Sequence, residues 1–298
     1  MELREPQFRA RKVARYEPKI MSHICVTCGT QYPTANDSPA ECPICKDERQ
    51  YIGPGGQEWI TLEALQKSHR NVFFVEGEGV WGIHTQPEFG IGQRALLLQT
   101  PNGGILWDCV SLLDASTVGL VKALGGLTAI AVSHPHYYGS MVEWSRAFGG
   151  IPIYLHEAER KWVQYPDSAI VFWKGETHPL NDDVTLIRVG GHFSGFQVLH
   201  WASGEKGSGA LMTGDMPQVV PDRRYVSFMY SYPNLIPVDA ATVRDIVSKL
   251  EPYKYSKLYG AWPKFVVSGD AKTALKRSAD RYLRAIGALS DTKTQTSR

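Results

Sequence analysis

The sequence lacks the features that define several large classes of protein. It contains no run of 18 apolar residues, and residues 1–20 contain no apolar segment of the kind found in secretory signals. We therefore expect a cytoplasmic protein without a membrane span. A formal net charge of +2 over 298 residues provides no basic excess for binding nucleic acid or an anionic membrane. With 43% hydrophobic residues, the chain can bury a full core, as enzyme-sized proteins do.

Cysteine is scarce and unevenly placed. Four of the five cysteines form two CxxC pairs, Cys25/Cys28 and Cys42/Cys45. Four thiolates on two tight turns match the tetrahedral coordination of structural zinc, so we predict a structural Zn²⁺ in a zinc-ribbon or rubredoxin-like knuckle. A redox iron site on the same sulfurs is an alternative, and disulfides are disfavoured in a chain without a secretion signal. The fifth cysteine, Cys109, lies in an apolar run and is interpreted as a core residue.

The composition divides the chain into unequal parts. The knuckle is predicted over residues 23–52, and a glycine- and proline-rich linker at residues 53–56 opens a main domain that runs to residue 290. Residues 1–22 are predicted to be a flexible N-terminal tail and residues 291–298 a disordered tail. The segment between the two CxxC pairs contains acidic residues and no lysine or arginine, so it does not indicate a nucleic-acid-binding face.

The main domain shows strands first, followed by alternating strands and helices. The predicted strands are 71–76, 80–85, 94–100, 105–110, 127–133, 151–155, 184–189, 197–201, 210–213 and 259–262; the predicted helices are 116–124, 140–148, 239–250 and 271–289. The early strands form hairpins, with a turn at residues 101–104. This order predicts layered sheets with helices on the outside.

Two histidines stand where a buried strand ends. The apolar run to Val132 is followed by Ser133, His134, Pro135 and His136, and later apolar runs end at His192 and Asp215. Neutral imidazole is a frequent metal ligand, and loops at strand ends are common positions for functional sites. Three imidazoles and a carboxylate suffice for one catalytic ion with an open position.

The order of these motifs resembles the metallo-β-lactamase fold superfamily. The resemblance covers roughly residues 72–289 and rests on the hairpin at 100–108, the segment His134-Pro135-His136-Tyr137-Tyr138-Gly139, Gly190-Gly191-His192, Thr213-Gly214-Asp215, and the strand ending at Trp262. The superfamily signature is HxHxDH, followed by a histidine, a bridging aspartate and a last histidine. The resemblance implies an α/β fold of the αβ/βα sandwich type, with a metal site at one edge of the paired sheets.

The departures from that signature concern the second metal position. His134, His136 and His192 match the first three histidines and Asp215 the bridging aspartate, but Tyr138 replaces the signature aspartate, Gly139 the following histidine, and Trp262 stands near the last one. Tyrosine, glycine and tryptophan do not readily ligate a second divalent ion. We therefore expect one metal or none at this site, and not a dinuclear centre.

The expected activity is metal-dependent hydrolysis of an ester, thioester or lactone. Zinc held by the histidines would ionise water near neutrality, with Asp215 orienting that water or accepting its proton. Tyr137 or Tyr138 would donate a hydrogen bond to a developing oxyanion; alternatively, both tyrosines only fill the volume of the lost metal.

Two other functions remain open. His134, His192 and Asp215 would form a 2-His-1-carboxylate site for Fe²⁺, in which respect persulfide dioxygenases of the same superfamily are similar, although His136 is then left over. Alternatively, the site is degenerate and the protein is a binding or scaffold module.

The segment after Asp215 is rich in aromatic residues and is predicted to face the substrate. It contains Arg223 and Arg224, which suit a carboxylate or phosphate, together with Phe228 and Tyr230; Trp262 is assigned to the same lining. A small and possibly aromatic substrate fits this lining. The same aromatic residues would also suit a homodimer contact.

Overall fold

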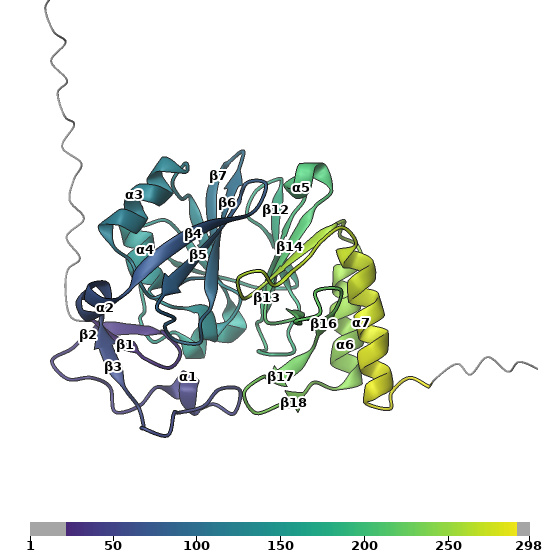
Figure 1. Ribbon diagram of the computed structural model, residues 1–298, viewed down its shortest axis with the longest axis horizontal. Coiled ribbons are helices and arrows are strands. Elements are labelled where there is room, and N and C mark those ends of the chain that lie inside the picture. The colour runs from purple at the N-terminus through teal and green to yellow at the C-terminus, as the bar shows by residue number, and fades with distance from the viewer. Residues whose placement is uncertain (1–21, 291–298) are drawn as a thin grey trace, which may run out of the picture.

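The computed structural model describes residues 22–290, so the predicted tails lie outside the described residues apart from Ser22. Two sheets face each other in the middle of the main domain, with α3 (Ala115–Ala123) and α4 (Met141–Ala147) beside one sheet and α6 (Ala240–Leu250) and α7 (Ala271–Ala285) beside the other (Figure 1). This is the αβ/βα sandwich that the sequence predicted.

The first sheet has seven strands in the order β10-β9-β8-β7-β6-β5-β4. Its first four strands along the chain form an antiparallel meander, and β7 to β10 are parallel. Because α3 and α4 make two of the parallel crossovers, both helices pack on the same outer face. The bounds are β4 (Arg70–Gly77), β5 (Val80–Gln86), β6 (Arg94–Thr100), β7 (Gly103–Trp107), β8 (Ala129–Ala131), β9 (Ile153–His156) and β10 (Ile170–Trp173).

The second sheet has six strands in the order β11-β12-β13-β14-β19-β20. Strands β14 and β19 are parallel and joined through α6, so their carboxyl ends meet at one edge of the sheet. The bounds are β11 (Thr177–Pro179), β12 (Val184–Arg188), β13 (Gln197–Trp201), β14 (Ala210–Gly214), β19 (Lys257–Gly260) and β20 (Val266–Val267).

The buried apolar side chains form layers that follow this arrangement. Leu96, Trp107, Leu199 and Met212 belong to the cluster between the two sheets, and separate clusters lie under each helical layer. In β6 and β7 alternate residues enter different clusters, because neighbouring side chains of a strand point to opposite faces. The strands are buried on both faces, which accounts for their nearly continuous apolar runs.

The knuckle forms a small sheet of its own, at the purple end of the chain in Figure 1. The sheet has the order β2-β1-β3, and β3 lies beyond residue 52, so this unit extends past the predicted boundary into the segment assigned to the main domain. The Ser111 hydroxyl donates to the Gly29 carbonyl at 2.7 Å, which ties the knuckle to the main domain. The bounds are β1 (Ser22–Cys25), β2 (Gln31–Thr34), α1 (Pro43–Lys46), β3 (Trp59–Thr61) and α2 (Leu62–Ser68).

Short elements complete the main domain. They are η1 (Pro135–Tyr137), η2 (Glu157–Trp162), α5 (Gly204–Gly207) and the two hairpins β15 (Gln218–Val219) with β16 (Val226–Ser227) and β17 (Met229–Ser231) with β18 (Ile236–Pro237). Over residues 22–290, no helix is long and apolar enough to cross a membrane.

Candidate metal centre

The first two candidate ligands lie in the loop that follows β8. His134 has an extended backbone, and Pro135 then begins the short helical turn η1. Proline suits the first position of a helical turn because its fixed φ is already helical and it has no N–H to leave unpaired. This change of backbone direction brings His134 and His136 together in one cluster, with ring centroids 4.9 Å apart.

The other two candidate ligands follow glycines with positive φ. Gly190 and Gly191 turn the chain after β12 toward His192, and Gly214 ends β14 immediately before Asp215. At Gly214 a Cβ atom would lie 2.7 Å from the Ser133 hydroxyl oxygen. The absence of a side chain there lets the Asp215 loop approach the loop that carries the first two histidines.

The structure brings His134, His136, His192 and Asp215 together, with one ligand atom from each residue within 4.8 Å of all the others. His192 Nε2 lies 3.4 Å from His136 Nδ1, and His134 Nε2 lies 3.3 Å from Asp215 Oδ2. All four side chains are buried. This convergence from three separate loops is what a single metal ion requires.

The outward nitrogens of two of the imidazoles are fixed by hydrogen bonds. His134 Nδ1 lies 2.9 Å from the Ser133 hydroxyl, and His192 Nδ1 lies 3.2 Å from the Met229 carbonyl oxygen. A carbonyl only accepts, so His192 Nδ1 carries the proton and Nε2 presents a lone pair to the cluster. Among the described residues, the buried His134 Nε2 and His136 Nε2 have no hydrogen-bond partner.

Burial keeps the three imidazoles neutral. It lowers the pKa of His134 and His136 well below the usual range, with Arg49 adding to the effect, and it lowers the pKa of His192 to about 3. Burial also raises the pKa of Asp215 to about 6. Neutral imidazole is the form that ligates a metal, so the donor set fits a divalent ion without prior loss of a proton from the histidines.

Tyr137 and Tyr138, for which the sequence left open a contact with the substrate or a purely space-filling role, are both buried and lie outside the cavity lining. The Tyr137 hydroxyl donates to Asp215 Oδ1 at 3.3 Å, whereas the Tyr138 hydroxyl is 3.5 Å from the Glu159 carbonyl oxygen. Tyr137 therefore holds the carboxylate, and Tyr138 packs in the core. Neither position is one from which a phenol contacts a substrate in this cavity.

A cavity of about 390 Å³ opens over the cluster. His136, His192 and Asp215 line it, and Trp262 lies on its wall, where the sequence placed it. The remaining lining residues come from the knuckle and from two loops: Arg49, Gln50, Tyr51, Glu88, Gly90, Ile91, Gly92, Tyr232 and Pro233. Tyr232 and Pro233 belong to the segment after Asp215 that the sequence predicted to face the substrate. Sequence reasoning missed the other residues of this list because they carry no motif.

Three other residues assigned to the substrate lie elsewhere. Arg223 and Arg224 line a separate surface pocket, and Arg224 is paired with Asp222 at 2.8 Å. Phe228 is fully buried against α7, with its ring 5.6 Å from that of Tyr282. Tyr230 lies near the cavity, because its ring centroid is 5.1 Å from the guanidinium of Arg49.

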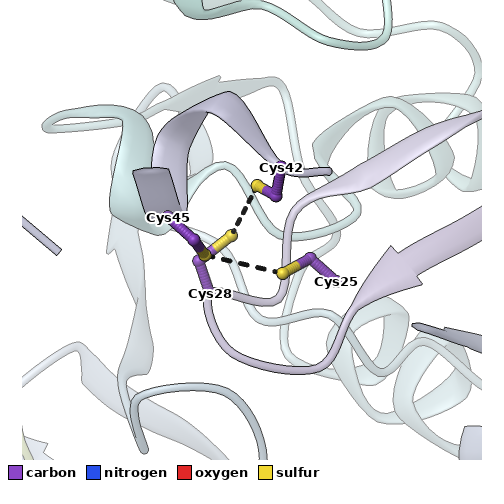
Figure 2. A group of neighbouring side chains, drawn as sticks. All are labelled: Cys25, Cys28, Cys42 and Cys45. Atoms are coloured by element: carbon purple, nitrogen blue, oxygen red, sulfur yellow. Dashed lines mark hydrogen bonds between the residues drawn. The ribbon is translucent and has the colours of Figure 1, made fainter. Parts of the chain in front are cut away.

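The four cysteines of the two CxxC pairs also converge (Figure 2). The Sγ atoms of Cys25 and Cys45 are 3.6 Å apart, and those of Cys28 and Cys42 are 3.7 Å apart. Tetrahedral zinc with Zn–S bonds of about 2.3 Å places its sulfurs about 3.8 Å from one another. All five cysteines lie in the described part of the chain and are free thiols, so the arrangement fits a metal and not a pair of disulfides.

Comparisons with solved structures agree with the fold. The chain superimposes on VMB-1 with a TM-score of 0.54, covering 73% of this chain and 98% of that one at 14% identity. It superimposes on the metallo-β-lactamase DIM-1 with a TM-score of 0.52, covering 70% and 95% at 15% identity, and on TMB-1 with 0.52, covering 71% and 97% at 15% identity. The chain therefore has the metallo-β-lactamase fold, as the sequence resemblance implied.

A comparison of sequences finds a nearer relative than the solved structures. The chain is 48% identical over 266 residues to the uncharacterized protein YmaE of Bacillus subtilis (strain 168), covering 89% of this chain and 96% of that protein. The chain belongs to the same family as YmaE. No family model matches it.

Proposed function

We propose that the protein is a metal-dependent hydrolase with a mononuclear site, acting on an ester, thioester or lactone of a small molecule. One observation carries the proposal: three neutral histidines and one carboxylate converge within 4.8 Å at the base of an open cavity. His134, His136 and His192 would hold the ion, with Asp215 beside it. Zinc at such a site supplies ionisation of water near neutral pH and polarisation of a carbonyl group.

Tyr138, Gly139 and Trp262 stand where the superfamily signature has the ligands of a second metal ion, and their side chains support one ion and not two. Tyr138 is turned toward the Glu159 carbonyl, and Gly139 offers no ligand atom in a side chain. Trp262 donates its indole N–H to the Ile91 carbonyl at 3.3 Å, and an indole has no lone pair to offer a metal.

Asp215 is the residue assigned to proton transfer. Burial raises the pKa of its carboxyl to about 6 in the metal-free site, and a bound divalent ion would lower that pKa and so favour the carboxylate that a general base requires. The hydroxyl of Tyr137 fixes one carboxylate oxygen, and burial raises the pKa of this phenol well above its usual value, so Tyr137 remains a donor. The other oxygen lies 3.3 Å from His134 Nε2 and would orient water and accept its proton.

The test combines metal analysis with hydrolysis. Wild type, His134→Ala, Asp215→Asn and the control His178→Ala, whose histidine lies outside both ligand clusters, are purified without added metal. Each protein is assayed for ions per chain and for hydrolysis of ester, thioester and lactone substrates. We expect His134→Ala to lose one ion and all activity, and Asp215→Asn to lose activity.

The alternative functions give different results in the same experiment. Iron in the wild type, with oxygen uptake in the presence of a thiol or persulfide, would favour the dioxygenase. An ion count unchanged in His134→Ala, with no hydrolysis in any variant, would reject the hydrolase and favour a binding module.

A further inference from the structure

The segment that follows the last cysteine of the knuckle forms one wall of the cavity. Helix α1 ends at Lys46, the Gln50 N–H donates to the Asp47 carbonyl at 2.9 Å, and Arg49 lines the cavity beside His136 and His192. The position of this segment is set by Cys45 only a few residues earlier. The metal-binding knuckle and the His/Asp cluster therefore border the same space.

Hydrogen bonds from the main domain hold this wall in place. The Tyr230 hydroxyl donates to Glu48 Oε1 at 2.7 Å, and Asn234 Nδ2 donates to the Glu48 carbonyl at 2.8 Å. Arg49 Nη1 donates to the His192 carbonyl at 3.3 Å, so the guanidinium lies next to a candidate metal ligand.

Arg49 is held rigidly by its neighbours. Its guanidinium carbon lies 4.0 Å from the centre of the Phe193 ring and 5.4 Å from that of Trp162. Asp47 accepts from Nε at 2.5 Å and from Nη2 at 2.7 Å, and the Arg49 side chain is 11% exposed. Burial opposes the charge, but the hydrogen bonds and the charge of Asp47 raise the pKa of Arg49, so the cation persists.

The donor count leaves Arg49 able to bind a further anion. A guanidinium has five N–H groups, and three of them are taken by Asp47 and the His192 carbonyl. One N–H on Nη1 and one on Nη2 remain, which is the number that a carboxylate needs for a bidentate contact. Among the described residues that line the cavity, Arg49 is the one permanent cation.

We propose that Arg49 binds a carboxylate on the substrate, so that the substrate is an ester, thioester or lactone that also carries an acidic group. The substrate class rests on the proposed function, whereas the anion contact does not. The aromatic and apolar lining from Tyr51, Tyr232 and Trp262 would contact the uncharged part of the same molecule. In this arrangement the knuckle supplies the residue that selects the substrate.

Binding of two uncleaved probes tests the anion contact independently of catalysis. Phenylacetate and phenylacetamide have nearly the same shape and differ in charge, and their affinities are measured by calorimetry on the protein as purified. We expect the wild type to prefer phenylacetate by tenfold or more, with the preference falling as salt is raised. We expect Arg49→Gln to lose most of this preference and Arg49→Lys to keep part of it.

The chain offers a matched control for the variant. Arg224 is paired with Asp222 two residues earlier through the same Nε and Nη2 atoms, but it lies on the surface away from the cavity. Arg224→Gln is expected to leave the probe preference unchanged. A preference for phenylacetate that survives in a folded Arg49→Gln, or is absent from the wild type, would overturn the proposal, because the metal itself can bind a carboxylate.

Hydrolysis separates the substrate class from the proposed function. 4-Nitrophenyl hydrogen succinate and 4-nitrophenyl butyrate have acyl chains of equal length, and only the first ends in a carboxylate. We expect Arg49→Gln to raise KM for the succinate ester by a factor at least ten times larger than the factor for the butyrate ester, with unchanged metal content. Equal losses for both esters would mean that Arg49 only holds the wall. Probe selectivity without hydrolysis of either ester would refute the hydrolase but keep the anion site.

Discussion

Replacement of Gly139 by alanine is expected to destabilise the fold strongly, because the residue occupies a position with no room for a side chain. Gly139 has a φ of +48°, and a Cβ atom there would lie 3.0 Å from the Cys109 carbonyl oxygen and 3.0 Å from the Val110 carbonyl carbon. Both are backbone atoms that cannot rotate away. The left-handed conformation costs alanine about 1–2 kcal/mol, and overpacking adds about 1–3 kcal/mol. The free energy of unfolding should therefore fall by about 2–5 kcal/mol.

Gly150→Ala is the matched control for this prediction. Gly150 has a φ of +76°, and a Cβ atom there would have no neighbouring atom within 4 Å, so only the conformational cost of about 1–2 kcal/mol applies. Urea unfolding of the two variants and the wild type measures both losses; in thermal unfolding each kcal/mol corresponds to about 2 °C. Equal losses would refute the steric argument. For the same reason, Tyr138→Asp with Gly139→His is not expected to restore a second metal ion.

Three further predictions concern other parts of the molecule. Tyr137→Phe removes a donor to buried Asp215 and should lower the free energy of urea unfolding by about 1–2 kcal/mol, whereas Tyr138→Phe, with a weak 3.5 Å contact, should change it little; equal effects would contradict the assignment. Cys42→Ser should remove one ion per chain and speed proteolysis within residues 22–61, and an unchanged ion count would reject the knuckle metal. Asp239→Ala removes the N-cap of α6 and should cost about 1 kcal/mol near pH 7. The hydrogen bond from the Thr242 N–H lowers the pKa of Asp239 in the folded protein. The stabilisation by this cap is therefore present above the pKa of Asp239 in the unfolded chain, about 3.9, and is lost as the pH falls below that value. A stability difference between Asp239→Ala and the wild type that persists in acid would contradict this prediction.

The layers of the fold and the His/Asp cluster were predictable from local patterns. Strands β6 and β13 have the predicted bounds because their apolar runs are buried on both faces and end sharply. His134, His136, His192 and Asp215 follow strands whose carboxyl ends share one edge, which is why residues distant in the chain converge. Predicted ends were less accurate at β8, which spans only Ala129–Ala131, and at α7, which ends at Ala285.

The cavity wall was not predictable from the same patterns. Asp47-Glu48-Arg49 and Asp222-Arg223-Arg224 have the same Asp-x-Arg spacing and the same local ion pair. Only long-range docking distinguishes them: Arg49 contacts a carbonyl 143 residues away, whereas Arg224 stays at the surface. The prediction that Phe228 faces the substrate was wrong, because its side chain packs in the core under α7.

The distance along the chain between the knuckle and its docking loop has a consequence for biosynthesis. Glu48 receives its hydrogen bonds from residues 182 and 186 positions later, Tyr230 and Asn234. During translation the four cysteines and Glu48 are made long before these partners, because the chain is synthesised from its N-terminus. The hydrogen bonds that hold the Arg49 segment can therefore form only after Tyr230 and Asn234 have been synthesised, so the cavity wall is completed late in the synthesis of the chain.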